Sequence, residues 1–265
     1  MNTCAPIRSL LPRALLAVAL AGVCASALAA DGLERAKQRG KLVAGIHYVV
    51  PEYKGGMKFR TPEALDTALL EDVARRVQLP LATVRAESGE ADIALVTIGE
   101  SDPLRRTATV IPTGYSSGPM AIMRADTDIK AWEHLKGRKV CVSEGGLHVG
   151  TLAARYGATE KVHKAPADSL LALRIGACDA AVHDSTMLEE LIKLPEWKKF
   201  SATLPVGPRT TLAFVVPAED KKSAAVLKQV ATAWAANGYL DWLMNKAVRQ
   251  IAFEVYLDQD VPDCH

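Results

Sequence analysis

The chain has 265 residues, of which 49% are hydrophobic, so it is long enough and apolar enough to bury a sizeable core. It carries 32 Lys and Arg residues and 30 Asp and Glu residues, and two of the arginines, Arg8 and Arg13, fall in an N-terminal leader-like segment. Without that segment the basic and acidic residues balance. The chain therefore has no electrostatic reason to bind nucleic acid or an anionic membrane.

The N-terminal segment has the pattern of a secretory signal peptide. Its two arginines precede an apolar run at residues 14–23 and a small-residue cleavage site that ends at Ala29. The apolar run is shorter than the roughly 20 residues of a membrane-spanning helix. Val23 is too large for a good lipoprotein signal at Cys24. The sequence predicts a signal peptide over residues 1–29, cleavage near Ala29 and a periplasmic location.

The rest of the sequence alternates between strand-like and helix-like stretches. A short helix ends at Gly40 and a strand follows at residues 42–46. A second helix is predicted to start at Thr61, with apolar residues every four positions on one face, Leu65, Leu69, Val73 and Val77. Further strands are predicted at residues 91–98, 118–125, 138–146, 179–182 and 210–217. Further helices are predicted at residues 131–135, 151–156, 167–175, 187–192, 221–236 and from 239 onward. This alternation predicts an α/β fold with doubly wound sheets, in which ligands bind beyond the carboxyl ends of the strands.

One of those strand ends carries a polar patch. The strand at residues 179–182 runs directly into His183, Asp184, Ser185 and Thr186, which precede a helix. Side chains at this position can face a ligand cleft. The alternative is that Asp184 or Ser185 caps the following helix.

Three cysteines lie beyond the predicted signal peptide: Cys141, Cys178 and Cys264. Disulfides persist in exported proteins, so an odd count indicates one bridge and one remaining thiol. The six histidines are scattered, and the sequence contains neither a Cys-x-x-Cys nor a His-Glu-x-x-His spacing. We therefore predict no metal site, and no cofactor is included in the prediction.

Five motifs occur in an order that resembles a known family. They are "LERAKQRGKLVAGI", "GEADIALVTI", "LKGRKVCVSEGG", "LLALRIGACDAAVHDS" and "WAANGYLDWLMNK". In this order they resemble the periplasmic solute-binding proteins, family 3, that serve amino acid ABC importers. The resemblance implies a two-lobed clamp in which each lobe is a doubly wound sheet with flanking helices. Residues 30–117 and 209–265 would form lobe one, and residues 118–208 would form lobe two.

The resemblance also implies a function. A monomeric protein would capture a small polar zwitterion such as an amino acid between the lobes and deliver it to an ABC transporter permease. The zwitterion requires a cation for its carboxylate and an anion for its ammonium group, and an arginine suits the carboxylate because it pairs bidentately. The ammonium partner falls on Asp184, and His183 resembles a position directed at the ligand side chain. The carboxylate partner falls on Arg105, with Arg106 as the reserve; the alternative is that both are solvated surface charges.

Further candidates lie in loops. Where the family has Gly-Ser/Thr-Thr, this chain has Gly145-Gly146-Leu147, so two hydroxyl donors are lost. The main-chain N–H groups of this loop, at Gly145 and Gly146, are predicted to bind the ligand instead. Tyr48 follows the first strand and is a candidate for stacking on the ligand, with an ordinary core position as the alternative. Glu100 and Glu144 are reserve candidates that would favour a basic solute, unless they only face water.

The sequence also departs from the family in "ALDTA" at residues 64–68 and in a lobe one that is shorter by about one element. Cys141 and Cys178 are predicted to form a disulfide, because their strands are candidates for neighbours in one sheet and because a general amino acid-binding branch of the family has cysteines at both places. A bridge to Cys264 and the absence of any bridge are the alternatives.

Three other functions compete with transport. Cyclohexadienyl or arogenate dehydratases resemble these binding proteins, and Glu100 or Glu144 would then supply the acid that such an enzyme requires. A clamp that acts as a periplasmic sensor or accessory protein is a further possibility. The "GYSSG" motif at residues 114–118 matches the elbow of serine hydrolases, but that elbow requires a strand before it and a helix after it, and here Pro112 precedes it and an apolar strand follows.

Overall fold

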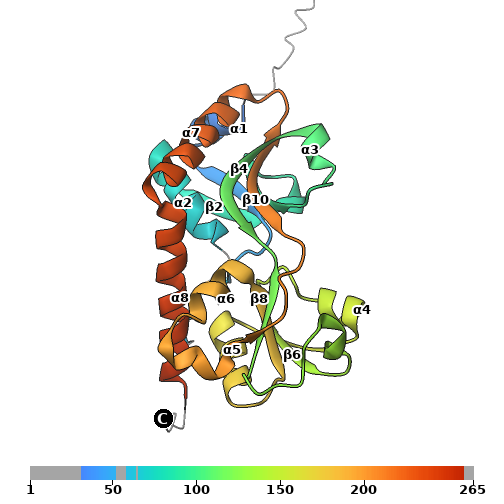
Figure 1. Ribbon diagram of the computed structural model, residues 1–265. Coiled ribbons are helices and arrows are strands. Elements are labelled where there is room, and N and C mark those ends of the chain that lie inside the picture. The colour runs from blue at the N-terminus through green and yellow to red at the C-terminus, as the bar shows by residue number, and fades with distance from the viewer. Residues whose placement is uncertain (1–30, 52–57, 64, 260–265) are drawn as a thin grey trace, which may run out of the picture. The chain divides into compact units, whose positions relative to one another are not determined.

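The computed structural model describes residues 31–51, 58–63 and 65–259. The predicted signal peptide and Cys264 lie outside these residues. Figure 1 shows the described chain as helices packed around two separate groups of strands. Among the described residues, no helix combines the length and the apolar composition that a membrane span requires.

The first sheet is mixed and has five strands. Its order is β2-β1-β3-β10-β4, with bounds β1 (Leu42–Ile46), β2 (Leu81–Arg85), β3 (Ile93–Ile98), β4 (Ala108–Ser117) and β10 (Thr210–Pro217). Strand β1 is parallel to β2 and β3, whereas β10 is antiparallel to β3 and β4. Leu42, Ala44 and Ile46 are all fully buried, as expected for a central strand covered by helices.

The second sheet repeats this plan. Its order is β7-β6-β8-β5-β9, with bounds β5 (Pro119–Met123), β6 (Lys139–Ser143), β7 (Thr159–His163), β8 (Ala180–Asp184) and β9 (Ala202–Thr203). Strand β6 is parallel to β7 and β8, so the carboxyl ends of these three strands meet at one edge. The prediction of an α/β protein with two doubly wound lobes is confirmed.

The helices flank these sheets. They are α1 (Gly32–Arg39), α2 (Asp66–Val77), α3 (Leu104–Thr107), α4 (Thr151–Tyr156), α5 (Pro166–Arg174), α6 (Ser185–Leu191), α7 (Lys221–Asn237) and α8 (Tyr239–Leu257), with 3₁₀ turns η1 (Ala86–Ser88), η2 (Trp132–Leu135) and η3 (Pro195–Phe200). The second helix begins at Asp66 and not at Thr61, which corrects the prediction. The stretch at 131–135 forms a 3₁₀ turn, not an α-helix.

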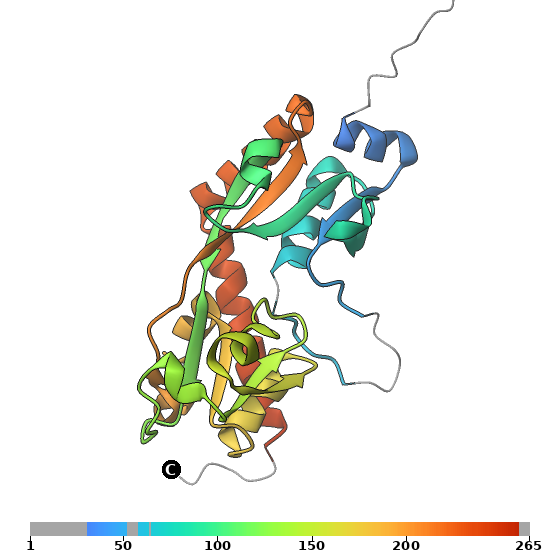
Figure 2. The ribbon, with the colours of Figure 1, turned by 90° about the vertical axis from the view of Figure 1, so that its right-hand side faces the viewer.

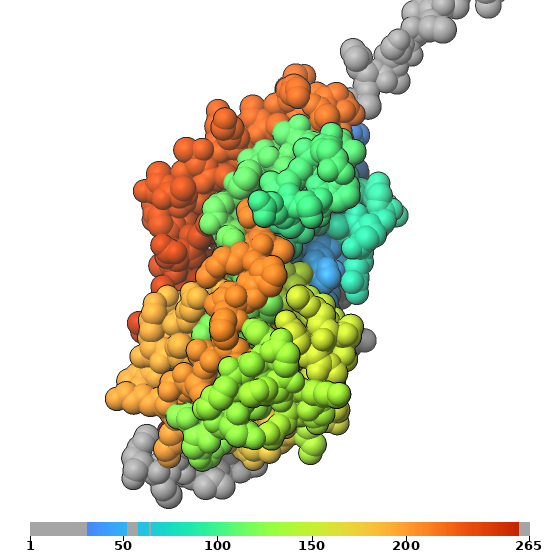
Figure 3. All heavy atoms as spheres, turned by 45° about the vertical axis from the view of Figure 1, so that its right-hand side comes forward, coloured from blue at the N-terminus to red at the C-terminus, as the bar shows by residue number. Residues whose placement is uncertain are grey.

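The chain crosses between the sheets twice. The first crossing runs from β4 through Gly118 into β5, and the second runs from β9 into β10. A Cβ atom at Gly118 would lie 2.6 Å from the Gly207 carbonyl oxygen, so glycine is required where the two crossings approach each other. Figure 2 shows the first crossing as one continuous ribbon, and Figure 3 shows the part of the chain that leads into β10, in orange, on the surface. Because β4 is extended through Ser117, the "GYSSG" motif does not form a strand–turn–helix elbow.

The two C-terminal helices pack on different partners. Helix α7 packs on β4 and β10 of the first sheet, whereas α8 packs on α5 and α6, which flank the second sheet. The assignment of residues 209–265 to lobe one stays a prediction. Helix α8 contacts α7 of predicted lobe one and also α5 and α6 of predicted lobe two. The predicted disulfide is confirmed: Cys141 of β6 and Cys178, just before β8, are bonded, with their Cα atoms 5.9 Å apart.

Candidate functional site

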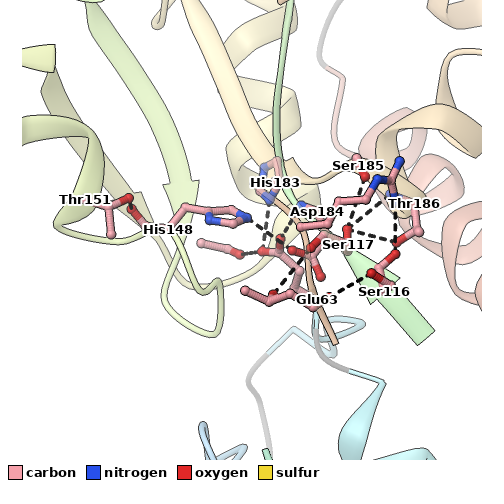
Figure 4. Close-up of polar contacts among 12 residues, drawn as sticks. Glu63, Ser116, Ser117, His148, Thr151, His183, Asp184, Ser185 and Thr186 are labelled. Atoms are coloured by element: carbon pink, nitrogen blue, oxygen red, sulfur yellow. Dashed lines mark hydrogen bonds and ion pairs between the residues drawn. The ribbon is translucent and has the colours of Figure 1, made fainter. Parts of the chain in front are cut away.

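A cluster of polar side chains lies at the carboxyl edge of the second sheet. Strand β6 ends at Ser143 and is followed by the glycine loop, and β8 ends with His183 and Asp184. The two strands are parallel neighbours, so their ends present these groups together. Figure 4 shows that Glu63, from the segment between β1 and α2, reaches into this cluster.

The Glu63 carboxylate is enclosed by donors of the second sheet. Its Oε2 accepts from the Ser143 hydroxyl and lies 2.9 Å from His183 Nδ1, and its Oε1 accepts from the Asp184 main-chain N–H at 3.2 Å. The side chain is only 4% exposed. A Cβ atom at Gly146 would lie 2.9 Å from Oε2, so the glycine provides the space for this carboxylate.

These donors determine the charge of Glu63. Burial by itself raises the pKa of a carboxyl group. Here the neighbouring His183 and the hydrogen bonds from His183 and Ser143 outweigh burial, so the pKa of Glu63 lies below its ordinary value. Glu63 is therefore an anion at neutral pH.

His183 is fully buried and links Glu63 to α5. A carboxylate can only accept a hydrogen bond, so Nδ1 of the imidazole is the donor to Glu63. The other nitrogen, Nε2, lies 2.9 Å from the Ser169 hydroxyl. Both ring nitrogens are thus engaged within the protein, which fixes the orientation of the ring.

Asp184 occupies the N-cap position of α6, but its side chain makes no capping hydrogen bond. Its Oδ2 accepts from the Tyr115 hydroxyl at 3.0 Å, and its Oδ1 lies 3.1 Å from His148 Nε2. Burial, followed by the charge of Asp184, raises the pKa of Tyr115, so the phenol keeps its proton and donates. The carboxylate of Asp184 is therefore directed away from the helix and toward Tyr115 of β4.

These residues line a small cavity of about 40 Å³, space for about three water molecules. The lining is formed by His47, Tyr48, Glu63, Leu65, Asp66, Leu95, Val96, Thr97, Tyr115, Ser117, Gly145, Gly146, Leu147, Asp184, Thr210 and Leu212. Within the described part of the chain this lining contains three carboxyl groups and no Arg or Lys. The cavity is therefore acidic.

Asp66 is the third of these carboxyl groups. It is 5% exposed, and it accepts a hydrogen bond from the Thr67 main-chain N–H at 2.9 Å. Burial raises the pKa of Asp66 from 3.8 to about 6, and the main-chain hydrogen bonds only partly oppose this rise. Across the described residues, no cation pairs with it.

Comparison with known proteins places this geometry in context. No family model and no curated protein sequence matches the chain. Solved structures do match. A mutant of ArgBP from T. maritima aligns at 21% identity with a TM-score of 0.57, covering 82% of this chain and 99% of that one. The chain has the fold of amino acid ABC transporter substrate-binding proteins.

Two further solved structures share this fold. AbpA from Streptococcus pneumoniae, an amino acid ABC transporter substrate-binding protein bound to L-arginine, aligns at 17% identity with a TM-score of 0.57, over 82% of this chain and 98% of that one. The ancestral amino acid-binding protein AncCDT-1, a precursor of cyclohexadienyl dehydratase, aligns at 17% identity with a TM-score of 0.56, over 82% and 99%. At these identities the similarity establishes the fold.

The substrate-binding fold brings only part of the predicted site together. Four predicted residues line the cavity: Asp184, Gly145, Gly146 and Tyr48. His183 does not line it but contacts the Glu63 carboxylate through Nδ1. Sequence reasoning missed Glu63, Asp66, Tyr115 and His148. Of these, Glu63 lies in the predicted start of a helix, and Tyr115 lies in the "GYSSG" stretch that resembles a hydrolase elbow.

The predicted carboxylate partner is elsewhere. Arg105 lies on the short helix α3, is exposed, and donates from Nε to the Gly99 carbonyl oxygen at 2.9 Å. Neither Arg105 nor Arg106 lines the cavity. Their expected role in ligand binding has no geometric support, because the side chain of Arg105 folds back on the turn that precedes its own helix.

The two reserve acids lie at the surface. Glu100 is exposed, and Glu144 is exposed with its Oε2 accepting from the Tyr48 hydroxyl at 3.3 Å. Burial, together with the nearby charge of Glu144, raises the pKa of Tyr48. Tyr48 is thus held beside the glycine loop by a residue at the rim of the cavity.

One group of potential metal ligands occurs in the described residues: Cys141, His163 and Cys178, whose ligand atoms lie within 4.8 Å of one another. The two sulfur atoms are bonded to each other. A disulfide offers no thiolate, which is the form of cysteine that coordinates metals. This group is a disulfide with an adjacent imidazole.

Proposed function

We propose that this chain is an exported solute-binding protein that captures a small polar solute with an ammonium group and delivers it to an ABC importer. The fold supports a binding role, because the neighbours above are described as amino acid-binding proteins. The observation that carries the proposal is the carboxylate of Asp184, which lines a small, partly open acidic cavity and does not cap its helix.

Asp184 is suited to bind an ammonium group. Its two oxygens already accept from Tyr115 and His148, which fixes their orientation, and carboxylate oxygens have further lone pairs for a ligand. In a partly enclosed site the attraction between the carboxylate and an ammonium group is screened less than in water. A hydrogen bond between charged groups contributes about 1.5 to 3 kcal/mol, which corresponds to about tenfold or more in affinity.

The test is a binding screen on the protein without its leader. Amino acids and simple amines are added in a thermal-shift assay, and the hits are measured by calorimetry. A ligand at 100 times its Kd adds about 2.7 kcal/mol of stability. Asp184→Asn should weaken the hit about tenfold or more while the unfolding free energy changes little. The control is Glu71→Gln, an exposed acid on α2, which should bind as the wild type does.

Two results would contradict the proposal. One is the absence of any stabilising solute in the screen for the wild type. The other is Asp184→Asn with unchanged affinity and an unfolding free energy lower by about 1 kcal/mol, which is the signature of a helix cap.

A dehydratase is the second candidate. Asp66, whose pKa is raised to about 6, is a buried acid of the kind that general acid catalysis uses near neutral pH. Glu63 does not suit this role because its pKa is lowered, and Glu100 and Glu144 are exposed. Formation of phenylpyruvate from prephenate, or of phenylalanine from arogenate, lost in Asp66→Asn, would favour the enzyme over the transporter component.

A further inference from the structure

Several groups of the second lobe that could bind a ligand carboxylate are already occupied. Three donors at the sheet edge, Ser143 Oγ, His183 Nδ1 and the Asp184 main-chain N–H, all contact the Glu63 carboxylate. In the glycine loop, the N–H of Glu144 donates to the His163 carbonyl at 2.8 Å and that of Gly146 to the Ser143 carbonyl at 2.9 Å. The protein's own carboxylate therefore occupies the anion-binding position.

The cavity also lacks the cation that a ligand carboxylate requires. Its described lining contains no Arg or Lys, and the imidazole of His47 is its only basic side chain. Arg60, the cationic residue closest in sequence to Glu63, forms ion pairs with Asp168 and Asp258. Lys58, Arg60 and Lys164 line an adjoining cavity that also includes Glu63. Within the small cavity, however, a ligand carboxylate would lie beside Glu63 without an Arg or Lys, and repulsion between like charges opposes this.

Two carboxyl groups in the same cavity remain available to a cation. Among the described residues, the side-chain partners of the Asp184 carboxylate are the Tyr115 hydroxyl and the His148 imidazole. Asp66 is more than nine-tenths buried, lines the cavity, and pairs with no cation among the described residues. An unpaired buried carboxylate is costly. An ammonium group bound between these residues would remove that cost.

The size of the cavity agrees with the head group of such a ligand, and the rest of a longer amine would extend beyond it. The remaining space is about 40 Å³. An ammonium head group occupies on the order of one water molecule's space, so it fits here together with a short apolar stem. Leu65, Leu95 and Leu212 supply the apolar part of the lining.

We infer that the solute is a cationic amine without a carboxylate, and that Glu63 supplies from within the protein the carboxylate that an amino acid would bring. This inference rests on the proposed function and narrows its ligand class. The decarboxylated counterparts of amino acids, such as agmatine for arginine and cadaverine for lysine, have this chemistry.

Matched pairs of ligands test the inference. Calorimetry on the wild type compares each amino acid with its decarboxylated amine, for example arginine with agmatine and lysine with cadaverine. At least one amine should bind about tenfold or more tightly than its amino acid, since the amino acid would leave one charge unpaired.

Two substitutions of Glu63 then distinguish the effect of its negative charge from the effect of the volume that its side chain occupies. Glu63→Ala frees the donors of Ser143, His183 and Asp184, so the amino acid should gain about tenfold or more and the preference between the pair should reverse. Glu63→Gln keeps the side chain in place, so it should give the amino acid no comparable gain. Glu71→Gln, with a change of charge on the exposed face of α2, should keep the preference of the wild type.

The outcomes distinguish the two proposals. If no amine and no amino acid binds the wild type, the proposed function fails. If amino acids bind the wild type as tightly as their amines or more tightly, the proposed function stands and the amine class is wrong. If Glu63→Ala is folded but binds the amino acid no better than the wild type, the role of Glu63 is wrong. If Glu63→Ala does not fold, the wild-type comparison alone decides the ligand class.

Discussion

Asp66 should destabilise the folded protein at neutral pH, and Asp66→Asn should therefore stabilise it. The pKa of Asp66 rises from 3.8 to about 6 because the group is buried. A carboxyl group whose pKa is higher in the folded state binds more protons in that state, so the protein loses stability as the pH rises from about 4 to above about 6. A rise of this size corresponds to about 3 kcal/mol at neutral pH.

The measurement is urea unfolding of the wild type and Asp66→Asn at several pH values. Near pH 7.5 the variant should be more stable by up to about 3 kcal/mol, and below about pH 4 the difference should vanish because the wild-type carboxyl group is then protonated in both states. The asparagine retains an oxygen that can accept from the Thr67 N–H. A variant that is no more stable at neutral pH, or whose advantage persists in acid, would refute the reasoning.

Three further predictions concern stability, each measured by urea unfolding. Replacing Cys141 and Cys178 by serine opens a link that spans 37 residues and should cost about 3 to 4 kcal/mol, an effect that a reductant should mimic in the wild type only. Arg60→Ala should cost about 1.5 to 3 kcal/mol, because Arg60 links the segment before α2 to Asp168 of α5 and to the residue after α8; a change below 0.5 kcal/mol, roughly that of an exposed pair, would contradict this. Asp220→Ala should cost about 2 to 3 kcal/mol, because this buried carboxylate accepts from the first turn of α7 and also from the N–H that begins α1; Asp220→Asn should recover part of the loss.

Six of the ten strands in the described residues and most helices could be predicted because their signals are local, whereas β2, β4, β7 and β9 were not predicted. Residues 151–156 and 210–217 form an α-helix and a strand with the predicted bounds. The strand "TTLAFVVP" is a run of apolar and β-branched residues that ends at a proline, and such a run needs no distant partner to be recognised. The order of five motifs then predicted the fold correctly.

The start of α2 could not be predicted from local signals. Thr61-Pro62-Glu63 has the composition of a helix N-terminus. In the structure, the Thr61 N–H and hydroxyl both donate to Glu254 of α8, 193 residues away. The Glu63 carboxylate accepts from His183 and Asp184 of β8 instead of from the first turn of a helix. These tertiary contacts keep residues 61–63 out of the helix, and they override local propensity.

Only part of the candidate site was predicted, because some of its residues have local signals and others are positioned by tertiary contacts. Asp184 could be found because it follows a buried strand, and strand ends position ligand groups in this class of fold. Tyr115 lies on β4 of the first sheet, yet its hydroxyl contacts Asp184 of the second. A contact between two sheets that are built from distant parts of the chain leaves no periodic signal in the sequence.

The departures of this sequence from the family pattern are related through one chemical change. The glycine loop carries Gly145, Gly146 and Leu147 where hydroxyl donors to a carboxylate are expected, and the expected arginine does not line the cavity. Both losses remove groups that bind a carboxylate. The "ALDTA" stretch stands where the family has "GFDVD" and keeps its first aspartate as Asp66, which lines the cavity together with the preceding Glu63. Because a site without an Arg or Lys and without hydroxyl donors in its glycine loop disfavours a ligand carboxylate, both substitutions agree with the proposed change of ligand from an amino acid to an amine.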